Sequence, residues 1–162
     1  MDISIIVVNW NTKYLLIECL DSIFQTIKSI DFEVWVVDNG STDGSIEAIR
    51  NRYRDINILK NRVNCGFAAA NNRALKQIKG RYALLLNTDA RLTDGAAEHL
   101  FNFMETTPEA GMACGQLLNP DGSRQNSFTN FPSVISLLSN ETILRTLFPN
   151  RFPSKRNNIR LQ

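Results

Sequence analysis

Two aspartates in this sequence stand where an α/β protein presents groups to a ligand, at the ends of short apolar runs. Asp38 directly follows the apolar run 32–37, and Asp89 closes the polar segment 87–89 behind the run 82–86. Such runs predict buried strands, and ligands of open α/β sheets lie outside the carboxyl ends of the strands. We therefore expect Asp89 to meet a divalent metal or a phosphate group, and Asp38 to face the same crevice.

A third aspartate, Asp43, lies in the loop 38–45, which is dense in polar residues and glycine. Asp and Asn side chains often cap helices and tighten turns in such loops. We favour this structural role for Asp43, whereas the position of Asp38 immediately after the strand favours ligand contact.

The sequence lacks the usual glycine-rich phosphate-binding turns. The apolar run 3–8 is followed by NWNTK, which is neither a G-x-G-x-x-G turn nor a phosphate loop with Gly-Lys-Ser/Thr, and the sequence has no G-x-S-x-G nucleophile elbow. The charge of a bound diphosphate would then have to be met by a metal on a carboxylate, and Asp89 is the candidate placed for it.

The rest of the chain is expected to position these strand ends. Apolar residues at helical spacing follow the first runs, with Thr12 as a plausible N-cap of the first helix and Gly80 as the C-cap of the third. The alternation predicts a doubly wound α/β fold with a mostly parallel sheet and helices on both faces. The expected strands cover residues 3–8, 32–37, 56–59, 82–86 and 111–118. A turn at 119–122 would return the chain over 123–130 as an antiparallel hairpin.

Length and composition indicate one folded domain with a basic end. The chain has 162 residues, 43% of them hydrophobic, which is enough for a sizeable core. Its net charge is only +2, but the last eighteen residues carry five basic side chains and no acidic one. Such an end can touch an anionic membrane surface or a nucleic acid, although we favour a frayed, solvated terminus and expect no nucleic-acid partner.

Cysteine usage and the first residues favour a cytoplasmic location. Cys19, Cys65 and Cys114 are odd in number and widely spaced, without metal-type pairing, which indicates a reducing compartment. The start MDISIIVVNWN has an acidic residue where a signal peptide would be basic, and no segment approaches the ~20 apolar residues of a membrane helix. Peripheral contact at the inner face of the membrane is the alternative that the basic end leaves open.

Four motifs together resemble the family 2 glycosyltransferases. They are IIVVNWN, VVDNGSTDGS, NCGFAAANN and LLLNTDA, in this order and at this spacing. The likeness runs from Ile3 to about Pro132, and QLLNPDGSRQ followed by FPS further resembles the rhamnosyltransferase-like branch. It implies the glycosyltransferase A-type fold and inverting transfer of a sugar from a UDP or dTDP donor to a cell-envelope glycan or lipid-linked acceptor.

The resemblance also implies roles for single residues. Asn87, Thr88 and Asp89 occupy the place of the family's D-x-D motif, whose last aspartate, here Asp89, coordinates a divalent metal, Mg²⁺ or Mn²⁺. The loop after the first strand would line the nucleoside pocket, Asp38 would bind the base or ribose, and the segment from Asn64 would shape the pyrophosphate side. The nucleotide-sugar-binding residues expected in this way are Val8, Asn9, Trp10, Asn11, Asp38, Asn39, Asn64, Gly66, Phe67, Asn71, Asn87 and Thr88.

The sequence departs from the family's pattern at two of these positions. Asn87 stands where many members carry an aspartate, so only Asp89 of the motif is charged, which is similar to an Asn-x-Asp-Ala variant of the branch. Asn71 stands where many relatives place an arginine against the phosphates. We expect that contact to be weaker or absent here.

No catalytic base is evident in the chain. Inverting transfer needs a carboxylate that deprotonates the acceptor hydroxyl, and the family supplies it well beyond the metal site. After Asp121 the only acidic residue is Glu141, in an apolar stretch. We therefore expect residues 1–132 to form the nucleotide-sugar-binding domain, 133–148 an apolar helix that starts a truncated acceptor half, and 149–162 a disordered basic tail.

Two other classes stay open. A nucleotidyltransferase of related architecture would carry a glycine-rich basic loop after the first strand, which NWNTK lacks. The second class is a non-catalytic nucleotide-binding or self-associating module, because an apolar helix without a partner domain would expose a hydrophobic patch and favour a homo-oligomer.

Overall fold

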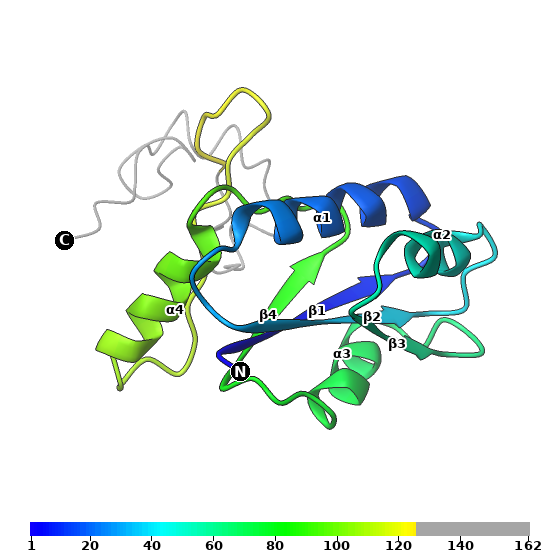
Figure 1. The fold of residues 1–162 in the computed structure, drawn as a ribbon, viewed down its shortest axis with the longest axis horizontal. Coiled ribbons are helices and arrows are strands. Elements are labelled where there is room, and N and C mark those ends of the chain that lie inside the picture. Colours follow the sequence, from blue (N-terminus) through cyan, green and yellow to red (C-terminus); the bar gives the residue numbers. More distant parts are fainter. Residues whose placement is uncertain (126–162) are drawn as a thin grey trace, which may run out of the picture. The chain divides into compact units, whose positions relative to one another are not determined.

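The computed structural model describes residues 1–125 of the chain (Figure 1). It divides at Cys114 into two compact units, and the first, Met1–Cys114, contains all the named helices and strands. The predicted apolar helix, the basic tail and the end of the predicted hairpin, residues 126–130, lie outside the described residues.

Within residues 1–125, four parallel strands form a sheet, in the order β3-β2-β1-β4. They are β1 (Ile3–Asn9), β2 (Phe32–Asp38), β3 (Ile56–Lys60) and β4 (Tyr82–Asn87). The chain builds outward from β1 to β3 and then returns to the other side of β1, which confirms the doubly wound α/β fold. The strand order therefore reverses between β1 and β4, and this switch point is where such sheets bind ligands.

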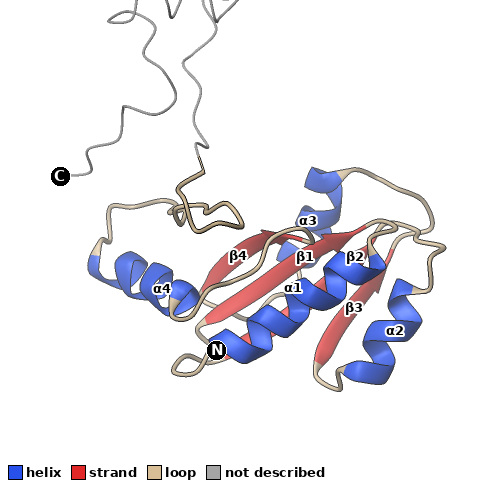
Figure 2. Ribbon diagram, turned by 90° about the horizontal axis from the view of Figure 1, so that it is seen from above, coloured by secondary structure: helices blue, strands red, loops and turns tan. Residues whose placement is uncertain are grey.

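Helices cover both faces of the sheet, as predicted (Figures 1 and 2). The helices α1 (Lys13–Thr26), α2 (Ser45–Arg52) and α4 (Ala96–Thr106) lie on one face, and α3 (Phe67–Leu75) lies on the other. None of the helices among residues 1–125 is both long and apolar enough to cross a bilayer.

The central strand β1 supplies both hydrophobic cores because successive side chains of a strand point to opposite faces. Ile5 and Val7 pack in the larger core with α1, α2 and α4, whereas Ile6 packs in the smaller core with two alanines of α3. This explains why β1 reads as a continuous apolar run in the sequence.

Residues 82–86 form a strand, as predicted, but the prediction that both of its faces are buried is wrong. Leu84 and Leu86 are partly buried against the larger core, but Leu85 is 46% exposed. The physical reason is that α3, the helix on that face, packs mainly against β1 and β2 rather than β4.

Helix α3 ends at Leu75, so the prediction that Gly80 caps it is wrong. Ile78 packs beside the smaller core, where the chain has already turned back toward the sheet. Gly80 instead crosses close to β1: a Cβ atom there would lie 2.4 Å from the backbone nitrogen of Ser4. Its N–H donates to the Ser4 hydroxyl at 2.8 Å, so glycine serves a close backbone approach.

The predicted strand at 111–118 is also wrong. Only an isolated antiparallel bridge joins Leu118 and Arg124 in this part of the described chain, while the predicted turn between them is present, with Gly122 donating to the Asn119 carbonyl at 2.9 Å. Met112 is 88% exposed. An apolar segment forms a strand only where a neighbouring strand pairs with it and a core buries its side chains. Residues 1–125 provide neither for this segment.

Candidate functional site

The loops that follow the four strands meet along one edge of the sheet. The parallel register sets Asn9 opposite Asp38, and Val8 opposite Asn87. The predicted nucleotide and metal residues at the ends of β1, β2 and β4 therefore share this edge, which includes the switch point.

Asn9, at the end of β1, is completely buried and holds three segments together. Its amide nitrogen lies 3.0 Å from Oδ1 of Asp38, 3.0 Å from the Ser41 hydroxyl and 2.9 Å from the Ser45 hydroxyl. Its amide oxygen accepts the hydroxyl hydrogen of Thr12 at 2.8 Å. The Asn9 side chain thus positions the loop after β2, and its predicted contact with a nucleotide stays a prediction.

The neighbouring residues of the β1 loop differ in what they offer. Val8 is half-buried beside the smaller core. Asn11 has a left-handed backbone with φ of 55°, and its side chain accepts the N–H of Thr42 at 2.8 Å. Trp10, between two residues that fasten the loops, is 55% exposed. Its ring is therefore the part of this loop that is open to a ligand.

At the end of β2, both residues of the predicted pair are buried. Asp38 is 3% exposed, and its second carboxylate oxygen accepts the N–H of Ser41 at 3.1 Å. Asn39 is 2% exposed, and its amide oxygen accepts from Asn61 at 2.7 Å and from the Cys65 thiol at 3.2 Å. These two side chains fix the loops after β2 and β3.

Asp43 has the structural role that the sequence favoured. Its carboxylate accepts the N–H of Lys13 at 2.8 Å, at the start of α1, and both the N–H and the hydroxyl of Ser45, at 3.0 and 2.6 Å. Partial burial acts to raise the pKa of Asp43, but the Ser45 hydroxyl and the two N–H groups outweigh it, so the pKa lies below its ordinary range.

The loop before α3 exposes a second aromatic side chain. Asn64 accepts the N–H of Gly66 at 2.9 Å, and Gly66 adopts a positive φ of 85° where the helix begins. Phe67, the next residue, is 51% exposed. Asn71 lies buried within α3, where its amide nitrogen donates to the Phe67 carbonyl at 3.0 Å and its oxygen has no partner among residues 1–125.

The loop after β4 carries two exposed residues of the predicted metal motif. Asn87 and Asp89 are exposed and Thr88 is half-buried. Within residues 1–125, no hydrogen bond engages the side chain of Asp89, in contrast to Asp38 and Asp43. This carboxylate is therefore available to a ligand.

Side chains of helix α1 contact the loop after β4 and hold it in place. The Cys19 thiol lies 3.5 Å from the Asn87 carbonyl, the Leu92 N–H donates to the Ser22 hydroxyl at 3.0 Å, and Arg91 pairs with Glu18. Burial, with a smaller contribution from the charge of Asp89, raises the pKa of Cys19 to about 12. Cys19 is thus a neutral thiol that packs beneath the loop.

The residues after β4 fit a divalent metal only in part. The segment offers oxygen donors, the carboxylate of Asp89 and the amide of Asn87, which suit Mg²⁺ or Mn²⁺. The described residues contain no cluster of three or more His, Cys, Asp or Glu side chains that could hold a metal ion. This donor set suits an ion that takes one carboxylate from the protein and further oxygens from phosphates and water.

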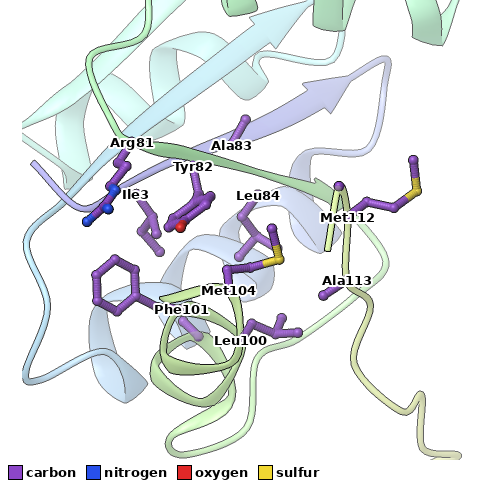
Figure 3. A pocket seen from close by; sticks show the side chains of 12 residues that line it. Ile3, Arg81, Tyr82, Ala83, Leu84, Leu100, Phe101, Met104, Met112 and Ala113 are labelled. Atoms are coloured by element: carbon purple, nitrogen blue, oxygen red, sulfur yellow. The ribbon is translucent and has the colours of Figure 1, made fainter. Parts of the chain in front are cut away.

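A separate pocket of about 320 Å³ lies between β4 and α4 (Figure 3). Its lining is largely apolar and includes Leu84, Phe101 and Met104, and Arg81 at its rim pairs with Glu105 at 2.7 Å. Arg81 precedes β4, so the pocket reaches the amino end of that strand and is not the carboxyl-end site. His99 is exposed on α4.

The supporting side chains are not evident from the sequence. The sequence predicts Thr12 only as a helix cap, and it predicts no role for the hydroxyl residues of the site, Ser22, Ser41 and Ser45. The available signal was the number of Ser and Thr residues in the strand-end segments, because such hydroxyls can satisfy buried amides and backbone groups.

Comparisons with known proteins agree with this geometry. A family model described as "Glycosyl transferase family 2" matches residues 4–159. A poly(ribitol-phosphate) beta-glucosyltransferase of Bacillus spizizenii is 29% identical over 93% of this chain and 25% of its own length. An N-acetylglucosaminyl-diphospho-decaprenol L-rhamnosyltransferase of Mycobacterium tuberculosis is 29% identical over 63% of this chain and 37% of its own length. The chain thus spans between a quarter and two fifths of these relatives.

Two solved structures share the fold. The S. aureus TarS fragment 1–349 in complex with UDP-GlcNAc is 24% identical, with a TM-score of 0.61 over 72% of this chain and 37% of that one. The mannosyltransferase PcManGT of Pyrobaculum calidifontis, in complex with GDP-Man and Mn²⁺, is 24% identical, with a TM-score of 0.62 over 74% of this chain and 36% of that one. Both likenesses show the fold.

Proposed function

Since the chain belongs to glycosyl transferase family 2, we propose that its strand-end edge binds the nucleoside diphosphate of a sugar donor, with a divalent metal on Asp89. The observation that carries this proposal is the contrast among the carboxylates of the edge. Asp38 and Asp43 are engaged by protein groups, whereas Asp89 is exposed beside the switch point.

In this proposal the remaining residues of the edge contact different parts of the donor. The exposed rings of Trp10 and Phe67 would contact the nucleoside and the pyrophosphate side. Asp38, Asn39, Asn64 and Gly66 would shape the pocket through the loops that they hold. A bound Mg²⁺ or Mn²⁺ would neutralise the charge that develops on the leaving diphosphate.

We further infer an inverting transfer to a cell-envelope acceptor carried on a lipid. The M. tuberculosis relative is named for a decaprenol-linked acceptor, and the basic residues near position 160 suit an anionic membrane surface. The transfer needs a base on the acceptor side, and residues 122–162 contain a single carboxylate side chain, Glu141. A protein of these 162 residues is therefore expected to bind the donor and to transfer sugar slowly or not at all.

Calorimetric titration tests donor binding. UDP, dTDP and GDP would be titrated into the protein with MnCl₂, with MgCl₂ and with EDTA. We expect one nucleotide to bind at least about tenfold more tightly with metal than with EDTA, which corresponds to ~1.4 kcal/mol. Equal affinities with metal and with EDTA would contradict the metal site, and no binding of any nucleotide would contradict the proposal as a whole.

Turnover tests the inference about the base. The protein would be incubated with the nucleotide sugar and a lipid-linked acceptor, and released nucleoside diphosphate would be measured over time. We expect release at the rate of the acceptor-free control. Rapid acceptor-dependent release would show that the chain supplies its own base.

A self-associating module is the second candidate, because the outward face of β4 leaves Leu85 46% exposed at an edge of the described sheet. Light scattering over a range of protein concentrations would distinguish the two. A monomer at high concentration would count against self-association and leave the donor site untouched.

A further inference from the structure

A chain of side-chain hydrogen bonds joins the loops after β1, β2 and β4, and Thr12 lies at its centre. The Thr12 hydroxyl lies 2.8 Å from the amide oxygen of Asn9 and 3.1 Å from the hydroxyl of Thr88. Asn9 in turn donates to Asp38 at 3.0 Å. This series of hydrogen bonds therefore runs from Thr88, the residue beside Asp89, to the carboxylate of Asp38 at the end of β2.

The protons of this chain can be assigned from the groups available. The amide oxygen of Asn9 is buried, and the Thr12 hydroxyl is its donor among residues 1–125. A buried acceptor without a donor is costly, so the single proton of Thr12 is directed to Asn9. The contact with Thr88 then uses the proton of Thr88. All three donors point toward Asp38, an order in which neighbouring hydrogen bonds strengthen one another.

The Thr12 hydroxyl is not needed to cap α1. Thr12 occupies the N-cap position, but its side chain makes no capping hydrogen bond. The carboxylate of Asp43 accepts the N–H of Lys13 instead, at 2.8 Å. A substitution that removes the Thr12 hydroxyl therefore leaves this cap in place and removes two contacts, the bridge to Thr88 and the hydrogen bond to the buried Asn9 oxygen.

The bridge is also the link between Asp89 and the nucleoside side of the edge. Cys19, Ser22 and Glu18 hold the β4 loop from one helix, but these contacts lead only into α1. The contact between Thr12 and Thr88 continues through Asn9 into the loop that carries Trp10. A shift of that loop on nucleotide binding would be transmitted to the residue next to Asp89.

We propose that Thr12 is a positioning residue that couples nucleotide binding at the β1 loop to metal binding at Asp89. The hydroxyl fixes the position of Thr88, and through it that of Asp89, relative to Asn9 and Asp38. Bound nucleotide therefore raises the affinity for the metal, and bound metal raises the affinity for the nucleotide. This inference rests on the proposed function and adds a residue that acts through others.

The test is the gain in UDP affinity that Mn²⁺ provides, measured by calorimetry with MnCl₂ and with EDTA. In Thr12→Val the gain is expected to fall by roughly 3- to 10-fold, the range expected from one hydrogen bond, while the affinity in EDTA stays within about twofold of wild type. Thr12→Ser keeps the hydroxyl and is expected to restore the gain.

Two further variants separate coupling from a general defect. Thr88→Val is expected to reduce the gain as Thr12→Val does. The double variant is expected to show no additional loss of the gain, because both substitutions remove the same contact, the one between Thr12 and Thr88. Thr26→Val is the matched control, since its hydroxyl bonds to the Ser22 carbonyl at the far end of α1 at 2.7 Å. It is expected to leave the gain unchanged.

A full gain in Thr12→Val, or an equal loss of UDP affinity with MnCl₂ and with EDTA, would overturn the proposal. If Thr12→Val does not fold, Thr88→Val gives the same decision. Wild-type protein that gains nothing from Mn²⁺ would reject the proposed metal site and this inference together, whereas a wild-type gain that survives both valine variants rejects only this inference.

Discussion

The loops after β2 and β4 both carry an aspartate at the end of a parallel strand, yet the two carboxylates differ in burial and in hydrogen bonding. Asp38 is 3% exposed and accepts hydrogen bonds from Asn9 and from the backbone of Ser41. Asp89 is exposed, and its neighbour Thr88 is the residue that the protein holds. One carboxylate is enclosed by protein donors, and the other is open to solvent.

This difference teaches that position at a strand end does not decide the role of an acidic residue. The position of Asp38 directly after its strand favours ligand contact, and the family resemblance implies that it binds the base or ribose. The structure shows that nearby donors, Asn9 above all, decide whether a carboxylate is satisfied inside the protein. The contrast predicts opposite effects for substitutions of Asp38 and of Asp89.

The largest effect is expected for Asp38→Ala. The substitution removes the acceptor of the buried Asn9 amide and of the Ser41 N–H, so the free energy of unfolding is expected to fall by about 2–4 kcal/mol. Urea denaturation measures this. A loss as small as that of an exposed residue would mean that the two aspartates are equivalent.

Asp89→Ala is expected to show the opposite behaviour. Because the side chain is exposed, the free energy of unfolding should change by less than about 0.5 kcal/mol. The Mn²⁺-dependent gain in nucleotide affinity should be lost, at least about tenfold or ~1.4 kcal/mol. Calorimetry with MnCl₂ and EDTA measures it, and a retained gain would remove Asp89 from the metal site.

Asp43→Asn addresses the structural carboxylate by pH. The variant keeps an acceptor oxygen for the α1 cap, so its loss of stability at pH 7 is expected to be about 1 kcal/mol. Because the pKa of Asp43 is lowered in the folded protein, its charge stabilises the fold above the pKa of the unfolded chain, and this contribution is lost as the pH falls below about 4.

Wild-type protein should therefore lose more free energy of unfolding than Asp43→Asn as the pH falls from about 5 to about 3. Thermal unfolding at a series of pH values from about 7 to 3 compares the two. Parallel curves would show that other carboxylates account for the acid sensitivity.

The smallest effect is expected for Arg91→Ala. Arg91 pairs with Glu18 on the surface, where both side chains are largely exposed, and such pairs contribute about 0–1 kcal/mol. The Cys19 and Ser22 contacts still hold the loop, so the Mn²⁺-dependent gain should change by less than about twofold. A large loss of metal binding would show that Arg91 itself takes part in the site.

Much of the fold could be predicted from the sequence because the strands on both sides of β1 are strongly patterned. The first four predicted strands are confirmed, and each observed strand includes its predicted run or extends it by one residue. The parallel, doubly wound arrangement follows from the alternation of strands and helices. The family resemblance is confirmed by the match over residues 4–159.

The errors have identifiable causes. Gly80 looked like a helix end, but it answers a close approach to Ser4, which is 76 residues away in sequence. The segment 111–118 looked like a strand, but its apolar side chains, such as Met112, are not received by a core in the described part. Local patterns do not contain such tertiary conditions.

The site was predictable in its location and less so in its working parts. The strand ends were placed correctly, and the metal and nucleotide roles stay predictions. Hydrogen-bond networks such as Thr12 with Thr88 depend on segments far apart in the chain, so no local spacing reveals them.

The central place of β1 has a consequence for how the protein folds during synthesis. Ile3 pairs on one side with Phe32 and on the other with Tyr82. Contacts between residues far apart in sequence form later, and a ribosome releases the N-terminal part first. The layer of β1, β2 and β3 can therefore assemble on the nascent chain while one edge of β1 waits for β4. The loop with Asp89 follows β4, so Asp89 joins the strand-end edge only after the sheet of the described residues is complete.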